Sequence, residues 1–501
     1  MQSITSKDGA RIVFAATTIL TTALLAACSD RSSPARLVAP GAPLRAEVPT
    51  APVVNSLADD GDGTCTDTKC TLRDAIAFAS PGATITFSVT GTITLAQGQL
   101  GILKDLTISG PGADRLAVDG REASHDFFVN YAPGTAAQAA DVSISGLTIK
   151  NGFDALDPVG GAIKHSGGTL TLTDVTISGS IASFGGGIYN DINGGVLMIT
   201  GSTIAGNQAN VGGGIFIQGG GASRITNSTI FSDTALFGGA GIYSGGSLTL
   251  ANSTVSGNIN LSAVPTDFGG AGIGGNGTTL LNTIVANNPK GGNCGGPVTT
   301  DGGYNIEDGT TCGFTAVTSH SNMDPQLDPA GLVPNGGPTS TIALLPLSPA
   351  IDLVPPGTNG CGTGITTDQR GATRPFGAGC DVGAYEANYR GFLPPINNVR
   401  TTPIHPGAGV PVQFTLGGFR GLDIFAPGSP NSVRIACPLS AGTGDVLLTD
   451  TPGNSGLSYD ATTDTYTYVW KTDKTWAGSC RRLVVSFGDG SVRTADFAFV
   501  R

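Results

Sequence analysis

Hydrophobic and polar residues alternate in short runs over residues 83–288. In one stretch, Leu170 and Leu172 share one phase. Val175 and Ile177 share the next phase, one residue out of step with the first. Alternation with a period of two predicts strands with one buried face, and the slip predicts a corner or bulge between two short strands. Gly, Asn and Ser separate the runs and predict turns, which leaves no room for helices in this region.

Two short phrases recur along these runs. The first is Gly-Gly-x-Ile or Gly-Ala-Gly-Ile, and its isoleucines are Ile163, Ile188, Ile215, Ile242 and Ile273. The second is a strand that ends in Thr-Ile or Thr-Val, and its threonines are Thr148, Thr176, Thr203, Thr229, Thr254 and Thr283. The steps are 25 to 31 residues for the first phrase and 25 to 29 for the second. Two phrases that keep one step indicate a structural repeat.

The length of the step predicts the fold. One repeat cannot bury its hydrophobic face alone, so successive repeats must stack. A step of about 26 residues with two or three short strands fits one coil of a parallel β-helix, whereas the blades of a β-propeller need about 40 residues or more. We therefore predict an all-β protein built on a right-handed parallel β-helix (solenoid) filled by rows of Ile, Val and Leu. Asn207 and Asn258 are expected to stack as an amide ladder at one turn.

A short helix is predicted over Cys70–Ala79, where it would cap the open end of the stack. Its apolar residues share one helical face: Leu72, Ala75, Ile76 and Ala79. Thr71 and Asp74 have the spacing of an N-cap residue and an acidic third residue, close to a capping box.

The last hundred or so residues change in character and contain both Trp residues. Tyr466, Tyr468 and Trp470 alternate with smaller residues and predict a strand with an aromatic face. Short strands with turn signals predict a small antiparallel β-sandwich at 396–501, after a linker at 388–395. We expect the aromatic row to lie in its core rather than to form a ligand platform.

The N-terminus has the features of an export signal. Lys7 and Arg11 precede an apolar run of about 14 residues, too short to span a membrane but typical of a signal peptide. The run ends in Leu-Ala-Ala-Cys, which resembles a bacterial lipobox, so 1–27 is predicted to be a lipoprotein signal peptide and Cys28 the site of lipid attachment. Residues 28–56 are rich in Pro, Ala and Ser and are predicted to be a tether. The β-helix is predicted over 57–387.

Composition narrows the possible partners and the compartment. Charged residues make up 13% of the chain. There are 26 Lys and Arg against 37 Asp and Glu, and this acidic balance disfavours binding to nucleic acid. Without Cys28, the nine Cys become an even eight. Proximity in the sequence suggests the pairs Cys65–Cys70, Cys294–Cys312, Cys361–Cys380 and Cys437–Cys480, among 105 possible connectivities. An oxidising compartment is implied; zinc is disfavoured because Cys-x2-Cys spacing is absent and there are 4 His.

Several segments resemble known families. Cys-Thr-Leu-Arg-Asp-Ala-Ile at 70–76 is similar to the Cys-Ser-Leu-Arg-Glu-Ala-Ile opening of bacterial surface β-helix proteins, and Leu-Thr-Ile-Ser-Gly-Pro-Gly-Ala at 106–113 is similar to their first coils. Asp-Gln-Arg-Gly at 368–371 and Asp-Val-Gly-Ala-Tyr-Glu at 381–386 resemble the closing segment of the choice-of-anchor Q family. Together these matches span roughly 57–387 and imply a fold and a surface location, but no reaction. The Gly-Gly-x-Ile phrase also resembles polymorphic outer-membrane proteins. Pro-Val-Gln-Phe at 411–414 resembles the PxKF domain, with Gln413 in place of its Lys.

Candidates for chemistry are few. Lys150, Asp154, Asp157, Lys164 and His165 form the local concentration of ionisable residues between 141 and 300, and we expect a solvated loop edge there. The run Asp-Asp-Gly-Asp-Gly at 59–63 offers oxygen atoms for Ca²⁺ but lacks the trailing Glu, so a plain turn is favoured. Neither a metal site nor a cofactor is predicted.

Two functions remain open at this point. The first is a non-catalytic, lipid-anchored protein of the bacterial outer membrane that contacts glycans or other surface partners. The alternative is a polysaccharide lyase or glycoside hydrolase, which would need paired carboxylates, or a base beside a cation, on the β-helix face.

Overall fold

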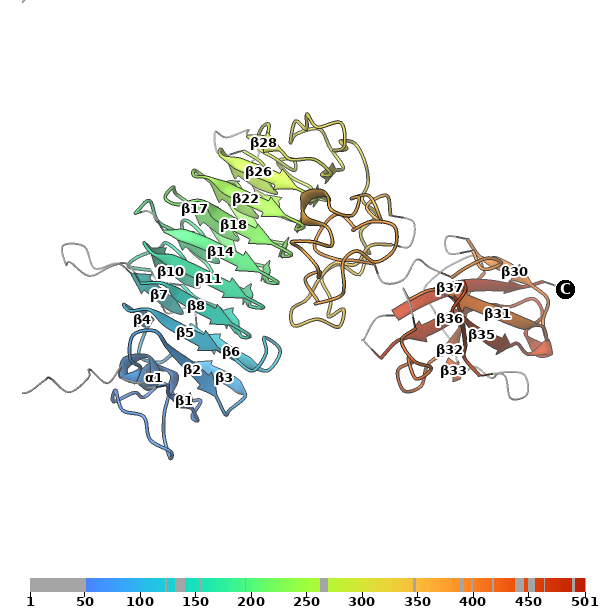
Figure 1. Cartoon of the computed structure of the whole chain (residues 1–501), viewed down its shortest axis with the longest axis horizontal. Coiled ribbons are helices and arrows are strands. Elements are labelled where there is room, and N and C mark those ends of the chain that lie inside the picture. Colours follow the sequence, from blue (N-terminus) through green and yellow to red (C-terminus); the bar gives the residue numbers. More distant parts are fainter. Residues whose placement is uncertain are drawn as a thin grey trace, which may run out of the picture. The chain divides into compact units, whose positions relative to one another are not determined.

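Figure 1 shows the computed structural model of the chain. The structure describes residues 51–500 apart from gaps at 122–123, 131–139, 154, 194, 262–268, 346–347, 388–391, 398–399, 417–418, 438–445, 449–455, 464 and 489–491. The predicted signal peptide, Cys28, most of the tether and Asp154 therefore lie outside the described residues.

The predicted parallel β-solenoid is confirmed, with about seven turns between residues 83 and 286. Its strands form three long parallel sheets. The ten-stranded sheet contains, in spatial order, β1 (Val53–Val54), β2 (Ala83–Phe87), β5 (Leu106–Ser109), β8 (Val142–Ser145), β11 (Thr169–Thr173), β14 (Val196–Thr200), β18 (Ser223–Thr226), β22 (Leu248–Ala251), β26 (Thr278–Leu281) and β28 (Thr300–Asp301). The seven-stranded sheet contains β4 (Leu100–Ile102), β7 (Phe127–Asn130), β10 (Ile163–Ser166), β13 (Ile188–Asn190), β17 (Ile215–Ile217), β21 (Ile242–Ser244) and β25 (Ile273–Gly275).

Two further sheets complete the coils. The nine-stranded sheet contains β3 (Gly91–Thr94), β6 (Leu116–Asp119), β9 (Thr148–Lys150), β12 (Thr176–Ser178), β15 (Thr203–Ala205), β19 (Thr229–Phe231), β23 (Thr254–Ser256), β27 (Ile284–Ala286) and β29 (Ile306–Glu307). A three-stranded sheet is formed by β16 (Gln208–Val211), β20 (Thr234–Gly238) and β24 (Ile259–Asn260). The strand at Val53–Val54 belongs to the ten-stranded sheet, so the ordered fold begins ahead of residue 57.

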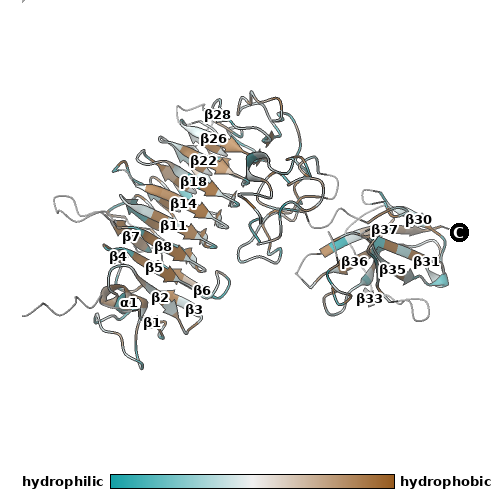
Figure 2. Ribbon diagram, in the orientation of Figure 1, coloured by the Kyte–Doolittle hydropathy of each residue, from teal (hydrophilic) through white to brown (hydrophobic). Residues whose placement is uncertain are grey.

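The repeat phrases set the register of the core. The isoleucines of the first phrase lie opposite one another from strand to strand in the seven-stranded sheet, and all five are buried. Figure 2 shows hydrophobic residues concentrated on the solenoid strands. In the nine-stranded sheet the last copy of the second phrase, Thr283-Ile284, is shifted by one residue relative to the copy before it. Thr254 pairs with Ile284, and Val255 pairs with Val285. Val285 therefore fills the solenoid interior, and Ile284 joins an apolar cluster outside it.

The predicted helix closes the N-terminal end of the solenoid. It is α1 (Leu72–Phe78), and the capping box is present: the Thr71 side chain accepts from the Asp74 backbone, and the Asp74 side chain accepts from Thr71. The apolar helical face is buried, as its spacing predicts.

A closing segment, residues 325–387, lies along the outer face of the nine-stranded sheet. Thr203 Oγ1 donates to the Ser340 carbonyl at 2.6 Å, and Thr229 Oγ1 donates to Gln369 Oε1 at 2.6 Å. The Ala384 backbone donates to Thr254 Oγ1 at 3.0 Å. The threonines of the second phrase thus point outward in these coils and hold the closing segment, which also contains the short 3-10 helix η1 (Thr358–Gly360).

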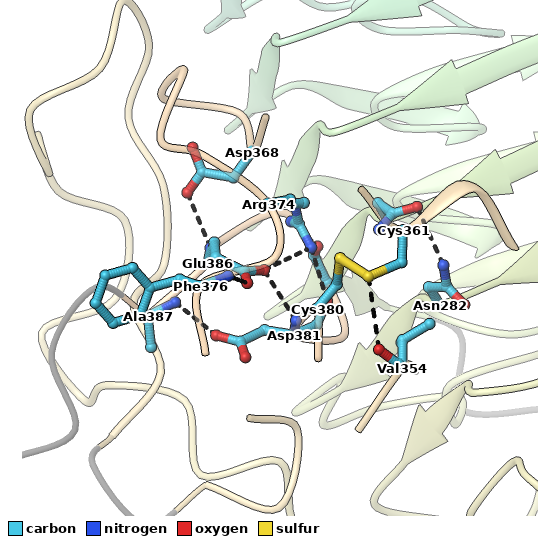
Figure 3. Close-up of polar contacts among 12 residues, drawn as sticks. Asn282, Val354, Cys361, Asp368, Arg374, Phe376, Cys380, Asp381, Glu386 and Ala387 are labelled. Atoms are coloured by element: carbon cyan, nitrogen blue, oxygen red, sulfur yellow. Dashed lines mark hydrogen bonds and ion pairs between the residues drawn. A yellow bond between two sulfur atoms is a disulfide. The ribbon is translucent and has the colours of Figure 1, made fainter. Parts of the chain in front are cut away.

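A buried charge cluster organises the closing segment (Figure 3). Arg374 Nη1 lies 3.2 Å from Glu386 Oε2, and both side chains have no solvent exposure. The two Glu386 oxygens accept backbone hydrogen bonds from Phe376 and Asp381 at 2.7 and 2.8 Å. Arg374 also donates to the carbonyls of Asp381 and Gly383, at 2.7 and 2.6 Å. Most of the hydrogen-bonding capacity of this ion pair is therefore used inside the segment.

The C-terminal body is a small β-sandwich, as predicted. One sheet contains β30 (Thr402–Ile404), β37 (Val492–Phe499), β36 (Cys480–Ser486), β32 (Asn431–Ile435) and β33 (Val446–Leu448). The other contains β31 (Gly409–Phe414), β35 (Thr465–Lys471) and β34 (Ser458–Asp460), and η2 (Lys474–Trp476) precedes β36. The pairing is antiparallel except between β30 and β37, which run parallel. Tyr466, Tyr468 and Trp470 are buried between the sheets, where Trp470 packs against Phe497 with ring centroids 5.2 Å apart.

The structure contains the four disulfides that proximity suggested: Cys65–Cys70, Cys294–Cys312, Cys361–Cys380 and Cys437–Cys480. The paired cysteines are 5 to 43 positions apart in the sequence. Gln413, at the position of the family lysine, lies on β31 and donates to Thr467 Oγ1 at 3.2 Å.

Candidate functional site

The outer face of the seven-stranded sheet carries a row of large side chains. Each strand is so short that it presents one main outward position, and the register aligns these positions from coil to coil. We call the following residues the aromatic column: Phe128, Lys164, Tyr189, Phe216 and Tyr243. The row ends at Gly101 on one side and at Gly274 on the other.

Three consecutive rings in the column, those of Tyr189, Phe216 and Tyr243, contact one another. The centroids of Tyr189 and Phe216 are 5.5 Å apart with an interplanar angle of 8°, and those of Phe216 and Tyr243 are 4.9 Å apart at 13°. Because carbon atoms in contact lie about 3.5–4.0 Å apart, near-parallel rings at these centroid distances are offset sideways by about 3 to 4 Å. Phe216, the middle ring of the stack, is only 8% exposed, whereas Tyr189 and Tyr243 on either side of it are partly exposed. Phe184, 38% exposed, adds an edge contact to Phe216 at 5.2 Å and widens the apolar surface.

The glycine phrase makes room for this column. The first glycine of the phrase has a positive φ, from 57° to 71°, in four of the five copies, at Gly160, Gly185, Gly212 and Gly239. A Cβ added to Gly212 or Gly239 would lie 2.8 Å from the Cβ of the column residue four positions later. Glycine is required here both by the left-handed backbone and by this close approach. The repeated glycines and the aromatic column are two parts of one local structure.

Charged groups gather at the N-terminal end of the column. The ammonium of Lys164 is ion-paired with Asp157 and lies 5.3 Å from the centre of the Phe128 ring. Asp157 Oδ2 also lies 3.9 Å from Nε2 of the buried His125. Burial raises the pKa of Tyr189, and the charges of Asp191 and Asp157 act in the same direction. Lysine and carboxylate charges thus balance one another at this end.

The sequence candidates for chemistry are only partly brought together. Lys164 and Asp157 meet, but Lys150 points elsewhere and lies 3.5 Å from Asp119. His165 is fully buried, with Nδ1 2.6 Å from Asn190 Oδ1, and burial lowers its pKa. The single solvated loop edge that the sequence suggests is therefore not found. The residues instead form two separate ion pairs, and His165 lies in the interior.

Two buried residues near this end are missed by the sequence pattern: His125 is 1% exposed and Asp126 is fully buried. Burial raises the pKa of Asp126 well above its ordinary value, and Asp119 acts in the same direction. A carboxyl held in this way stays away from the surface that a polymer would touch. Both residues immediately precede β7, a position that short-range patterns do not distinguish from any loop.

The carboxylates at 59–63 serve the N-terminal cap. Asp59 accepts two hydrogen bonds from Arg73, at 2.9 and 3.1 Å, and Asp60 pairs with Lys69 at 3.1 Å. Asp62 accepts from the backbone of Thr64 at 3.0 Å. Their oxygens are therefore engaged in separate local contacts. In the part of the chain that the structure describes, no three His, Cys, Asp or Glu side chains converge on a common metal position.

The aromatic column itself leaves a signal in the sequence. The residue directly after the isoleucine of each glycine phrase is Lys164, Tyr189, Phe216, Tyr243 or Gly274. In a strand this position points to the face opposite the buried isoleucine, so three aromatic residues in five copies could have indicated an outward row.

Comparisons with known proteins add no relative: no family model, curated protein or solved structure matches this chain. Among the helices that the structure describes, none has the length and hydrophobicity needed to cross a bilayer.

Proposed function

We propose that this is a non-catalytic, lipid-anchored protein of the bacterial cell surface whose aromatic column binds glycan. The observation that carries the proposal is the column itself, an offset stack of aromatic rings on an outer sheet face. Aromatic rings bind the C–H faces of sugars, and extended solenoid faces provide long binding surfaces. The four disulfides support a location outside the cytoplasm.

The surroundings of the column favour a neutral ligand over an anionic one. Lys164, between Phe128 and Tyr189 in the column, is neutralised by Asp157, so it offers little net attraction to a uronate. The chain as a whole carries a formal charge of −11, which repels polyanions. Hydroxyl and amide groups of Tyr189 and Gln218, which bond one another beside the column, supply hydrogen-bonding partners of the kind that sugars use.

The alternative, a lyase or hydrolase, would rely on the ionisable groups near the same face. There, Asp157 is engaged by Lys164 and His125, and Asp126 is fully buried. This arrangement supports binding rather than acid–base chemistry, which needs a group free to exchange a proton with the substrate. The family resemblance at 57–387, to choice-of-anchor Q proteins, and the PxKF-like C-terminal body point to the same kind of surface protein.

Removing the rings is expected to weaken glycan binding without unfolding the protein. A glycan array with the purified protein would first identify a bound glycan. Replacing Tyr189 and Tyr243 together by Ala should then reduce affinity for it at least tenfold, about 1.4 kcal/mol. Met198→Ala is the matched control, because Met198 lies in the same region of the solenoid on the outward face of the ten-stranded sheet. An unchanged affinity in the double variant, with an unchanged melting temperature, would contradict the proposal.

Anchoring is tested separately. In cells fed radiolabelled palmitate, the wild-type protein should be labelled and sediment with membranes, whereas Cys28→Ala should lose the label. Cys65→Ala, which removes a cysteine from a disulfide of the cap, is the control and should keep it. Label that persists in the Cys28 variant would rule out attachment at this residue.

A further inference from the structure

One turn of the solenoid contains the predicted amide ladder, with an unexpected member. Asn207 and Asn258 are both in it, but Asp233 stands between them. Asn207 donates to Asp233 Oδ1 through its backbone nitrogen at 2.8 Å and through Nδ2 at 3.0 Å. Asn258 donates in the same two ways to Asn288 Oδ1, at 3.0 and 3.1 Å. Each asparagine therefore makes two hydrogen bonds to the next residue of the ladder.

Asp233 makes only one of these two bonds. Its backbone nitrogen donates to Asn258 Oδ1 at 3.0 Å, but Oδ2 has no hydrogen-bond partner. The side chain is fully buried. An orphaned oxygen in the interior of a protein is costly, and more so if it carries charge.

The packing shows which atom Oδ2 has replaced. The third glycine of the phrase lies against the amide nitrogen of each asparagine: a Cβ on Gly241 would be 3.0 Å from Asn258 Nδ2, and one on Gly187 would be 3.3 Å from Asn207 Nδ2. At the equivalent place, a Cβ on Gly214 would be 2.6 Å from Asp233 Oδ2. Oδ2 thus occupies the position of a hydrogen-bond donor. Without a proton, it would turn a second oxygen toward groups that are acceptors at the other steps of the ladder.

The carbonyl groups of the neighbouring coil also require a hydrogen-bond donor at the position of Oδ2. Asn207 Nδ2 also donates to the Ile177 carbonyl at 3.2 Å, and Asn258 Nδ2 to the Ile230 carbonyl at 3.3 Å. These carbonyls belong to the coil before each asparagine, so the repeat places the Ile204 carbonyl opposite Asp233. A carboxylate there would face a carbonyl oxygen, whereas a carboxylic acid can donate to it.

We propose that Asp233 carries a proton in the folded protein, and that loss of this proton weakens the central coils, so that the ladder is a pH-sensitive element of the solenoid. The groups that face Asp233 are Asn207 in the preceding coil, Asn258 in the following coil and the backbone of Gly214, and none of them is charged. Burial raises the pKa of Asp233 well above its ordinary value, against the two hydrogen bonds from Asn207. No charge from the described residues contributes to that shift.

The direction of the pH effect follows from linkage. An aspartate in the unfolded chain has a pKa of about 3.9, so at acidic pH below this value both states are protonated and the ladder keeps its full contribution. As pH rises, the unfolded chain releases its proton first, and the contribution of the protonated side chain is lost progressively up to the raised pKa of the folded state. Asparagine at this position does not titrate and keeps a donor at every pH.

Thermal unfolding of the full chain tests the proposal. Asp233→Asn should raise the melting temperature by several degrees at pH 8, and this gain should disappear as pH falls to about 4. Asp67→Asn, at an exposed position, is the control and should show no pH-dependent difference. Other buried carboxyls, Asp126 among them, titrate equally in wild type and variant and cancel in the difference. A gain that is independent of pH, a loss of stability at pH 8 or a failure of the variant to fold would each overturn the proposal.

Hydrogen exchange gives a second test. After correction for intrinsic rates, raising pH from 5 to 8 should speed amide exchange in the coils at 203–260 of the wild-type protein several-fold more than in the same coils of Asp233→Asn. Equal acceleration in the two proteins would also overturn the proposal.

Discussion

Replacing Arg374 by Met is expected to destabilise the closing segment by about 3–5 kcal/mol, the typical cost of removing one partner of a buried ion pair. Burial raises the pKa of Glu386, and Arg374 opposes this shift. Without the guanidinium, the buried Glu386 carboxylate would lose its ion pair beside Asp381, and the carbonyls of Asp381 and Gly383 would lose their donor. The melting temperature and hydrogen exchange over 325–387 measure the effect.

Two comparisons separate charge from packing at this site. Adding Glu386→Gln to Arg374→Met should recover part of the loss, because the remaining side chain then needs no cation. Lys69→Met breaks a pair with Asp60 whose side chains are 45% and 66% exposed, and should cost under about 1 kcal/mol. If Arg374→Met costs no more than Lys69→Met, the cluster does not hold the closing segment.

Replacing Gln369 by Glu is the second change expected to have a large effect, about 2–3 kcal/mol at neutral pH. Gln369 is 2% exposed, and its Nε2 donates to Thr203 Oγ1 and Thr339 Oγ1 at 3.0 and 2.9 Å. Nε2 also donates to the Ser340 carbonyl at 3.0 Å. The change is nearly isosteric, but it places an oxygen, and at neutral pH a charge, where a donor is required. The closing segment should then detach from the coils more readily.

The loss in the Gln369 variant should depend on pH. Burial without a cation raises the pKa of the new carboxyl in the folded state, so protonation near pH 4 should restore much of the stability. Limited proteolysis across pH, with cleavage sites mapped to 325–387, measures this recovery. Gln208→Glu, at an exposed position of the solenoid, is the control. A loss that is the same at pH 4 and pH 8 would show that charge is not its cause.

Several features of this fold could be predicted because they depend on residues close in the chain. The step between phrases determines the coil length, and alternation marks the strands on each side of the slip after Thr173. The capping box at Thr71 and Asp74 and the four disulfides involve short separations. For the strands and the capping box, local geometry leaves few alternatives, so patterns and spacing are sufficient. For the disulfides, proximity in the sequence selected the right pairs among 105 connectivities.

The candidate site was harder to predict, because its residues come together only when successive coils stack. Tyr189, Phe216 and Tyr243 are 27 residues apart from one to the next, and each by itself is an ordinary residue after a buried isoleucine. Asp233 lies midway between Asn207 and Asn258, one step from each, so the ladder could have been extended to it by counting. His125 and Asp126 offered no comparable periodicity.

What the sequence by itself determined is the repeat: the coil length, the buried rows, the capping helix, the cysteine pairs and a separate aromatic-cored sandwich. Tertiary structure alone decided the last register, in which Thr254 pairs with Ile284, and the placement of the closing segment, where Thr229 meets Gln369 across 140 residues. It also decided which outward residues form a column and which carboxyl lies inside a ladder of amides. The physical reason is that stacking and burial act between residues a full coil or more apart, whereas sequence patterns report the preferences of near neighbours.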